Sequence, residues 1–118
     1  NIKKMNLLIK LLITTILVFV IAYFLPGITV VDLTTALIVA TVLGVLNLFL
    51  KPILIFLTIP ATIITLGLFL LVINAVIVLI ADHFVSGFLV SGFWSALFFS
   101  ILLSFGQSVM NKMFINEE

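Results

Sequence analysis

The chain has 118 residues, of which 65% are hydrophobic and only 8% are charged, and its formal net charge is +1. A soluble domain carries about 25% charged residues, so this composition excludes a water-soluble globular protein and predicts an integral membrane protein. The absence of cysteine excludes disulfides, thiolate nucleophiles and cysteine-ligated metals. We therefore expect one small all-α membrane domain over residues 1–118.

Four apolar runs have the length that a helix needs to cross a bilayer, which is about 20 residues. They are Leu7–Leu25, Leu33–Leu50, Ala61–Ala81 and Phe93–Met110. Proline, glycine and serine between the runs predict turns. The sequence therefore predicts four transmembrane helices, with Asp32 as the N-cap of the second and Ser91 as the N-cap of the fourth.

The segment between the second and third runs, residues 52–60, is apolar but too short to span. From Pro52 to Ile59 it reaches only about 12 Å as a helix. Pro52 suits the first position of a helix, and Pro60 disfavours helical geometry at Ile59. We therefore expect a short interfacial helix here, separate from the spans on either side.

The lysines predict the orientation of the chain in the membrane. With four spans, all five lysines fall on the side of the two termini, whereas the opposite loops hold Asp32, Asp82 and His83. By the positive-inside rule, both termini are expected in the cytoplasm, and the protein is expected in the bacterial inner membrane. The lysines are Lys3, Lys4, Lys10, Lys51 and Lys112.

The chain also repeats itself, because one constant shift in numbering lays Leu8–Leu50 over Leu68–Met110 without a gap. Matching turn glycines, Gly27 and Gly87, support this register, which we call the repeat shift. We therefore expect two parallel two-helix repeats, one over about residues 7–51 and one over about residues 61–112. A pseudo-two-fold axis would then lie along the membrane normal, as in parallel transporter repeats.

Two apolar triplets follow the turn glycines on the outer side, Ile28–Val30 and Phe88–Val90. Loops in water are rarely this apolar, and these residues suit an extended conformation. The repeat axis would bring the two triplets together. We therefore expect them to pair as strands over the outer helix ends.

Small residues recur every fourth position in the second and fourth spans. Such stripes let membrane helices approach closely, and the serines could instead form a polar pore face. We expect the stripes to face protein, so that Gly44→Leu disturbs packing more than Leu43→Ile. The stripes are Ala36, Ala40 and Gly44 in the second span, and Ala96, Ser100 and Ser104 in the fourth.

Three amide side chains lie inside the predicted spans: Asn47, Asn74 and Gln107. An amide in hydrocarbon needs a hydrogen-bond partner, so we expect bonds between helices, with an ion or water path as the alternative. Asn47 and Gln107 occupy equivalent positions in the two repeats. Both are expected at the edge of the small-residue contact, bonding the other stripe or a neighbouring odd-numbered span.

No ionisable side chain lies at mid-membrane, which argues against proton-coupled or ion-coupled transport. Small multidrug transporters have a similar length and four helices, but they depend on a membrane-embedded carboxylate that this chain lacks. Asp82-His83 alone makes neither a metal site nor a catalytic triad. No phosphate-binding loop or basic cluster is present. We therefore expect no enzyme activity, no cofactor and no nucleic-acid partner.

Several segments, in order along nearly the whole chain, resemble the small four-helix membrane proteins grouped as phage holin superfamily IV. Thr65–Asn74 is the most specific segment, and Lys51 and Ser86 stand where the family more often has arginine and proline. The other segments are Leu25-Pro26-Gly27-Ile28, Gly44-Val45-Leu46-Asn47, Lys51-Pro52-Ile53-Leu54 and Ser91-Gly92-Phe93-Trp94.

The resemblance implies a protein that oligomerises and permeabilises the membrane to release a lytic enzyme. Many members, however, look like chromosomal bacterial proteins without a known role. The second hypothesis is therefore a non-permeabilising membrane component, either an envelope-stress protein or an accessory subunit of a larger complex. A channel or carrier is a third possibility. The expected partners are the lipid bilayer and further copies of the chain or a larger membrane complex.

Overall fold

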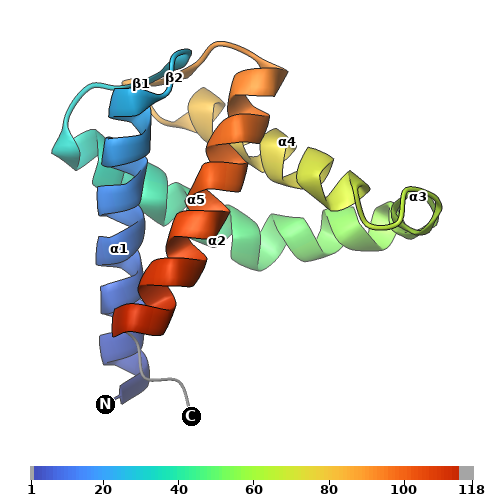
Figure 1. Cartoon of the computed structure of the whole chain (residues 1–118), viewed down its shortest axis with the longest axis horizontal. Coiled ribbons are helices and arrows are strands. Elements are labelled where there is room, and N and C mark those ends of the chain that lie inside the picture. Colours follow the sequence, from blue (N-terminus) through green and yellow to red (C-terminus); the bar gives the residue numbers. More distant parts are fainter. Residues whose placement is uncertain (1, 115–118) are drawn as a thin grey trace.

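The computed structural model describes residues 2–114, which form five helices and two short strands (Figure 1). α1, α2 and α5 are each long and apolar enough to cross a membrane, and α4 is a shorter apolar helix. The fold is therefore helical, as expected of a four-span membrane protein. The predicted domain ends, residue 1 and residues 115–118, lie outside the described part. The elements are α1 (Ile2–Phe24), β1 (Ile28–Val30), α2 (Leu33–Leu57), α3 (Ile59–Ile64), α4 (Phe69–Phe84), β2 (Phe88–Val90) and α5 (Phe93–Phe114).

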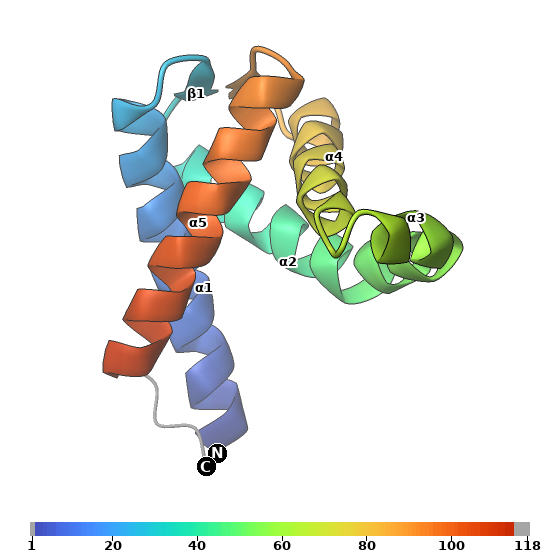
Figure 2. The ribbon, with the colours of Figure 1, turned by 45° about the vertical axis from the view of Figure 1, so that its right-hand side comes forward.

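The helix pairs α1 with α5 and α2 with α4 meet at one end of the molecule and diverge from each other toward the other end (Figures 1 and 2). At the first end, which we call the strand end, α1 and α4 finish, β1 and β2 lie together, and α2 and α5 begin. At the second, the open end, α1 and α5 run toward the termini, whereas α2 and α4 run away from them to α3. The two strands therefore lie at the end where each of the four long helices begins or finishes.

The two strands pair antiparallel, with Thr29 opposite Leu89 at the centre of the ladder. Bonds on either side extend the pairing: the Val31 N–H donates to the Gly87 carbonyl at 3.0 Å, and the Ser91 N–H donates to the Gly27 carbonyl at 2.7 Å. The predicted pairing of the two outer triplets is confirmed. It provides partners for backbone groups that a membrane interface would solvate poorly.

Gly27 and Gly87 let the chain turn from a helix into a strand. Both have positive φ, 90° and 88°, which a residue with a Cβ rarely adopts. A Cβ on Gly27 would also collide with the Ser91 and Ser95 side chains, and one on Gly87 would press on Thr35. Each turn therefore packs closely on the start of the helix that follows the other strand.

The expected separate helix over residues 52–60 is wrong, because α2 continues through Pro52 to Leu57. A proline inside a helix loses one backbone bond, a loss that membrane helices tolerate where side chains and local adjustments satisfy the freed group. α2 instead ends at Leu57, and the hydroxyl of its C-cap residue Thr58 donates to the Leu54 carbonyl at 2.7 Å. Pro60 lies in the first turn of α3, the short helix that follows.

The predicted third span, Ala61–Ala81, is also wrong in its bounds, because the chain breaks between α3 and α4. Leu66 has φ 57° and Gly67 has φ 89°. The Gly67 N–H donates to the Thr62 carbonyl and the Leu66 N–H to the Ile63 carbonyl, which is the bond pattern of a Schellman helix end. The helix that follows the break, α4, has 16 residues.

The apolar core lies toward the strand end. Phe88 and Phe99 are fully buried, with ring centroids 5.8 Å apart, and Val18, Val39 and Ala81 are also fully buried. α1 packs against α2 and α5, and α4 packs against the same two helices. The core therefore joins both halves of the chain.

Candidate functional site

A polar cavity of about 100 Å³ lies where α2, α4 and α5 meet, next to the apolar core. Leu43, Ile77, Val78 and Leu103 are buried and form its apolar wall. The rest of the lining is polar. These polar residues are Asn47, Lys51, Asn74, Ser100, Ser104 and Gln107.

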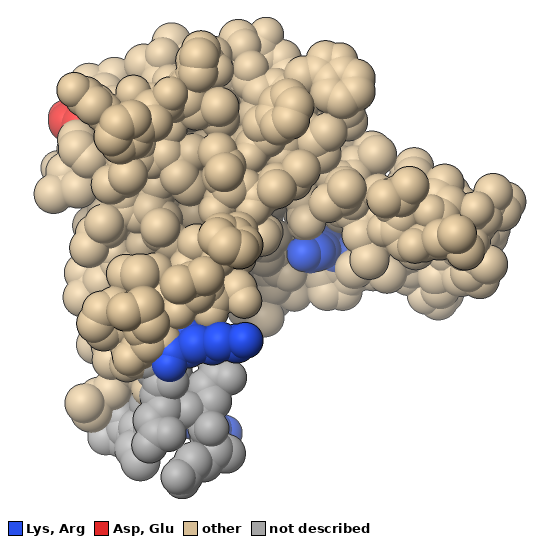
Figure 3. Space-filling model, in the orientation of Figure 1, with Lys and Arg blue, Asp and Glu red and all other residues tan. Residues whose placement is uncertain are grey.

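Helical spacing places the lining residues of α2 on one face. Leu43, Asn47 and Lys51 recur at every fourth position, so they lie one above another along the helix. The face changes along its length from an apolar residue to an amide and then to an ammonium group. Figure 3 shows lysine atoms in the recess between the helix body and the projecting α3 end. The cavity therefore becomes more polar toward its mouth.

Gln107 bonds a helix from the other repeat. Its Nε2 donates to the Thr14 hydroxyl of α1 at 2.8 Å. The expectation that Gln107 bonds a neighbouring odd-numbered span is confirmed, with α1 as that span. The bond joins α1 to α5 beside the cavity, on the side of the core that faces the open end.

Asn47 and Asn74 occupy the same positions in the second helix pair, because the repeat shift superimposes Asn47 on Gln107 and Thr14 on Asn74. Both amides line the cavity. Among residues 2–114, however, neither side chain forms a hydrogen bond. Asn47 is exposed and Asn74 is half-buried, so their donors and acceptors remain available inside the cavity.

The small-residue stripes lie only partly inside the protein. Ala36, Ala40, Ala96 and Ser100 are buried, and the Ser100 hydroxyl donates to a carbonyl one turn earlier in its own helix. Gly44 and Ser104, the third member of each stripe, are exposed.

A Cβ on Gly44 would meet no atom within 4 Å, whereas Leu43 is 3% exposed. Within one chain, the expectation that Gly44 packs against a neighbouring helix is therefore not met. α1 and α2 have already separated at this level. For a single chain, we therefore expect Leu43→Ile to disturb packing more than Gly44→Leu, the reverse of the order predicted from the sequence.

Gly44 instead faces an open groove of about 440 Å³ between α1 and α2. Its lining is mostly apolar, with Thr41, Thr14 and Gln107 as the main uncharged polar residues. The full lining is Leu7, Lys10, Leu11, Thr14, Ala40, Thr41, Gly44, Val45, Leu48 and Gln107.

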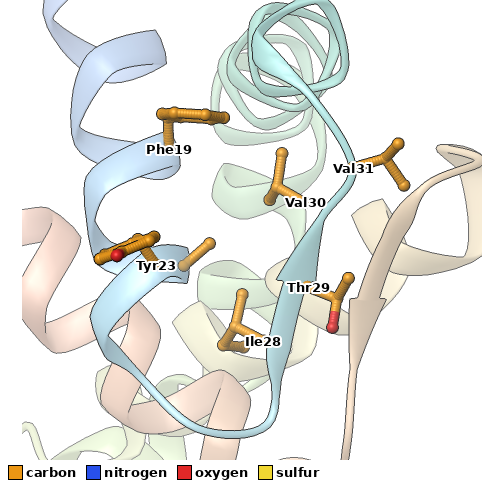
Figure 4. Close-up of a pocket in the computed structure, with 7 residues that line it drawn as sticks. Phe19, Tyr23, Ile28, Thr29, Val30 and Val31 are labelled. Atoms are coloured by element: carbon orange, nitrogen blue, oxygen red, sulfur yellow. The ribbon is translucent and has the colours of Figure 1, made fainter.

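A third hollow, of about 380 Å³, lies at the strand end (Figure 4). Phe19 and Tyr23 of α1 face Ile28 and Val30 of β1 across it. Tyr23 is 81% exposed, as an interfacial aromatic residue would be.

The acidic residues that the structure describes stabilise the strand end. Asp32 caps α2 by accepting from the Thr35 N–H at 2.8 Å, which confirms the predicted cap. This bond and a second one from the Thr35 hydroxyl lower the pKa of Asp32. Asp82 accepts from the Val90 N–H at 3.3 Å.

The Ser91 hydroxyl bonds Ser95 rather than the helix backbone, so the predicted Ser91 cap is wrong.

Thr14 and Lys51 were not predicted from the sequence as members of these sites. The repeat shift that superimposes Thr14 on Asn74 was a signal for the first, and the helical spacing from Asn47 was a signal for the second. No cluster of potential metal ligands occurs among the described residues.

Comparisons with known proteins give a consistent result. A family model described as "Mycobacterial 4 TMS phage holin, superfamily IV" matches residues 5–109. The "Uncharacterized membrane protein YvlD" of Bacillus subtilis (strain 168) is 34% identical over 105 residues, which cover 88% of each protein. The "Uncharacterized protein SCO3922" of Streptomyces coelicolor is 41% identical over 81 residues, 65% of each chain. No solved structure matches the chain.

Proposed function

The chain belongs to the four-span phage holin superfamily IV family, and from this premise we propose that it permeabilises the bacterial inner membrane as an oligomer. The observation that carries the proposal is the open groove between α1 and α2. Gly44 lies exposed there, with no atom of the chain near the position of a Cβ. Small exposed residues in a membrane helix favour close contact with another helix.

A single chain does not provide a polar route through the membrane in this proposal. The cavity at the centre is closed toward the strand end by the buried core around Phe88 and Phe99. Permeation would therefore take place between subunits, with the groove of one copy receiving a helix of the next.

We further propose that two parallel repeats form each subunit, with both termini in the cytoplasm. Several observations support the repeat. The repeat shift superimposes β1 on β2 and the start of α2 on the start of α5, and the two strands pair about their central residues. Lysine on the side of the termini and acidic residues at the strand end support the orientation. In this arrangement the protein binds lipid, has no cofactor and catalyses no reaction.

Release of fluorescent dyes from liposomes tests the proposal. The purified protein should release dye with a steep dependence on protein concentration, since pores form between subunits. Gly44→Phe should block the groove and abolish both release and chemical cross-linking. Val45→Phe, a neighbouring change that also lies at the groove, should weaken both less. Dye retention by liposomes that contain cross-linked oligomers of the unchanged chain would contradict the proposal.

The second candidate is a non-permeabilising membrane component, such as an envelope-stress protein or an accessory subunit. The closed core of the single chain favours it, because the described apolar residues leave no open path at the strand end. The same experiment separates the two candidates. A non-permeabilising component would retain the dye at every concentration, even where cross-linking detects oligomers.

A further inference from the structure

We propose that the cavity between α2, α4 and α5 binds a phosphate group, with Lys51 as its charged ligand and Asn47 and Asn74 as its hydrogen-bond donors. The proposal is independent of permeabilisation. It starts from the donors that line the cavity and from the lack of a carboxylate among the lining residues to satisfy them.

Lys51 provides the positive charge. It lies in the second half of the 25-residue helix α2, and the helix continues beyond it with no further charge. Ionisable residues in a membrane segment usually face a protein interior and pair with an opposite charge. Asp32 and Asp82, the acidic residues among those described, bond Thr35 and Val90 at the strand end. The cavity therefore contains a cation but no carboxylate.

The two asparagines provide neutral donors. At the equivalent positions of the repeat, Gln107 donates a hydrogen bond to Thr14. Asn47 and Asn74 form no such bond within the described residues, although both line the same cavity as Lys51. An amide that is left without a partner away from water costs free energy, and this applies to Asn74, which is half-buried. A bound group that accepts hydrogen bonds would remove this cost.

The combination selects an anion. Amide oxygens and serine hydroxyls can also coordinate cations, but the Lys51 ammonium would repel a cation from so small a space. A cavity of about 100 Å³ exceeds the roughly 10–15 Å³ that one water needs, so a group the size of a phosphate can enter it. Hydrogen bonds from charged and amide donors to phosphate oxygens are strong ones.

Two sources can supply this phosphate: the headgroup of an anionic phospholipid and free inorganic phosphate. The surface beyond Lys51 suits lipid chains, because Phe56, Leu57 and Leu68 are exposed by 65–73%. Basic pockets between transmembrane helices bind anionic headgroups in this way. The chemistry of the phosphate is common to both sources, so the experiment must distinguish them.

The test uses the whole protein in an uncharged maltoside detergent, with thermal unfolding followed by fluorescence of Trp94, the single tryptophan. Three probes are added separately: phosphatidylglycerol, diacylglycerol with the same acyl chains, and inorganic phosphate. Native mass spectrometry counts bound lipid. Lys51→Gln removes the charge, Lys51→Arg keeps it, and Lys112→Gln is a matched control because Lys112 does not line the cavity.

We expect phosphatidylglycerol to raise the unfolding temperature of the unchanged protein, Lys51→Arg and Lys112→Gln. Its affinity for Lys51→Gln should fall about tenfold or more, because a charge-assisted bond is lost. Asn47→Leu, at an exposed position that tolerates substitution, should weaken binding by a smaller factor. If inorganic phosphate alone gives the Lys51-dependent shift, the ligand is the free anion rather than a lipid.

Two results would overturn the proposal. One is equal stabilisation of the unchanged protein and Lys51→Gln by phosphatidylglycerol and by phosphate. The other is equal stabilisation by diacylglycerol and phosphatidylglycerol, because the site would then recognise acyl chains and not a phosphate.

Discussion

The strand end and the open end of this molecule are built from the same four helices but are held together differently. At the strand end, fully buried side chains from both halves of the chain surround a backbone ladder. At the open end, Phe56, Ile64 and Leu66 are 73%, 80% and 93% exposed. Apolar side chains are exposed at both ends, with Phe24 and Phe84 at the strand end exposed by 75% and 69%, but the fully buried side chains lie toward the strand end. In a membrane, apolar composition alone does not decide which residues form the core.

The largest expected difference between the two ends comes from removing an aromatic ring. Phe88→Ala should lower the free energy of unfolding by about 3 kcal/mol or more, because it leaves a cavity against Phe99. Phe56→Ala, at an exposed position of α2, should change it by less than about 0.5 kcal/mol. Thermal unfolding in detergent measures both. Equal losses would mean that the open end is packed in solution.

The break between α3 and α4 should be sensitive to backbone strain rather than to packing. Leu66 has positive φ, which costs a residue with a side chain roughly 1–2 kcal/mol. Leu66→Gly should therefore stabilise the protein by about 1 kcal/mol. Leu66→Ala is the control, since it removes the same exposed side chain but keeps the strain. A gain from alanine as large as that from glycine would show that strain is not the cause.

Two helical glycines at similar distances from the strand end compare an open position with a packed one. Gly44→Ala places a methyl group in open space and should stabilise α2 by roughly 0.5–1 kcal/mol in monomeric protein. Gly106→Ala in α5 should increase stability less, because the added Cβ would lie 2.9 Å from the Leu17 side chain and that side chain must move. Chemical unfolding in detergent at low protein concentration measures both. A loss of stability for Gly44→Ala would indicate that a partner helix already occupies the groove.

The smallest expected effect is a dependence of the strand end on pH. Hydrogen bonds from Thr35 lower the pKa of Asp32 in the folded protein. Its contribution to stability is therefore complete above the unfolded pKa, near about 3.9, and is lost as the pH falls through the lower folded value. Asp32→Asn keeps a capping oxygen that does not titrate. Unfolding curves between neutral and acidic pH should converge for the two proteins, and parallel curves would contradict the prediction.

The sequence predicted the strand end better than the open end. The turns at Gly27 and Gly87 and the Asp32 cap follow from local patterns, and the pairing of the two triplets follows from the internal repeat. The prolines gave wrong helix ends at the open end, because Pro52 lies inside α2 and Pro60 lies in the first turn of α3. The break instead occurs at Leu66-Gly67. Gly67 indicated a possible helix end, but the continuous apolar run from Ala61 to Ala81 favoured a single span.

The sequence predicted which amide side chains matter in the candidate site, but not that they line one cavity together. The amides Asn47, Asn74 and Gln107 were expected to bond between helices, and Gln107 does so. Their gathering with Lys51 in one cavity depends on how α2 and α4 tilt away from the other helices. No local pattern specifies that tilt, so neither the cavity nor the exposure of Gly44 could be deduced from spacing.

Pairing between β1 and β2 also has a consequence for the order of folding. The two strands belong to different halves of the chain, so the ladder cannot form until the second hairpin has been synthesised and inserted. Contacts between residues this far apart close a long loop and therefore form late. During synthesis, the first hairpin is therefore inserted in the bilayer before β2 is available, so β1 is unpaired and the core residues of the second half are absent. Truncation after Pro60 should therefore leave an insertion-competent but protease-sensitive fragment.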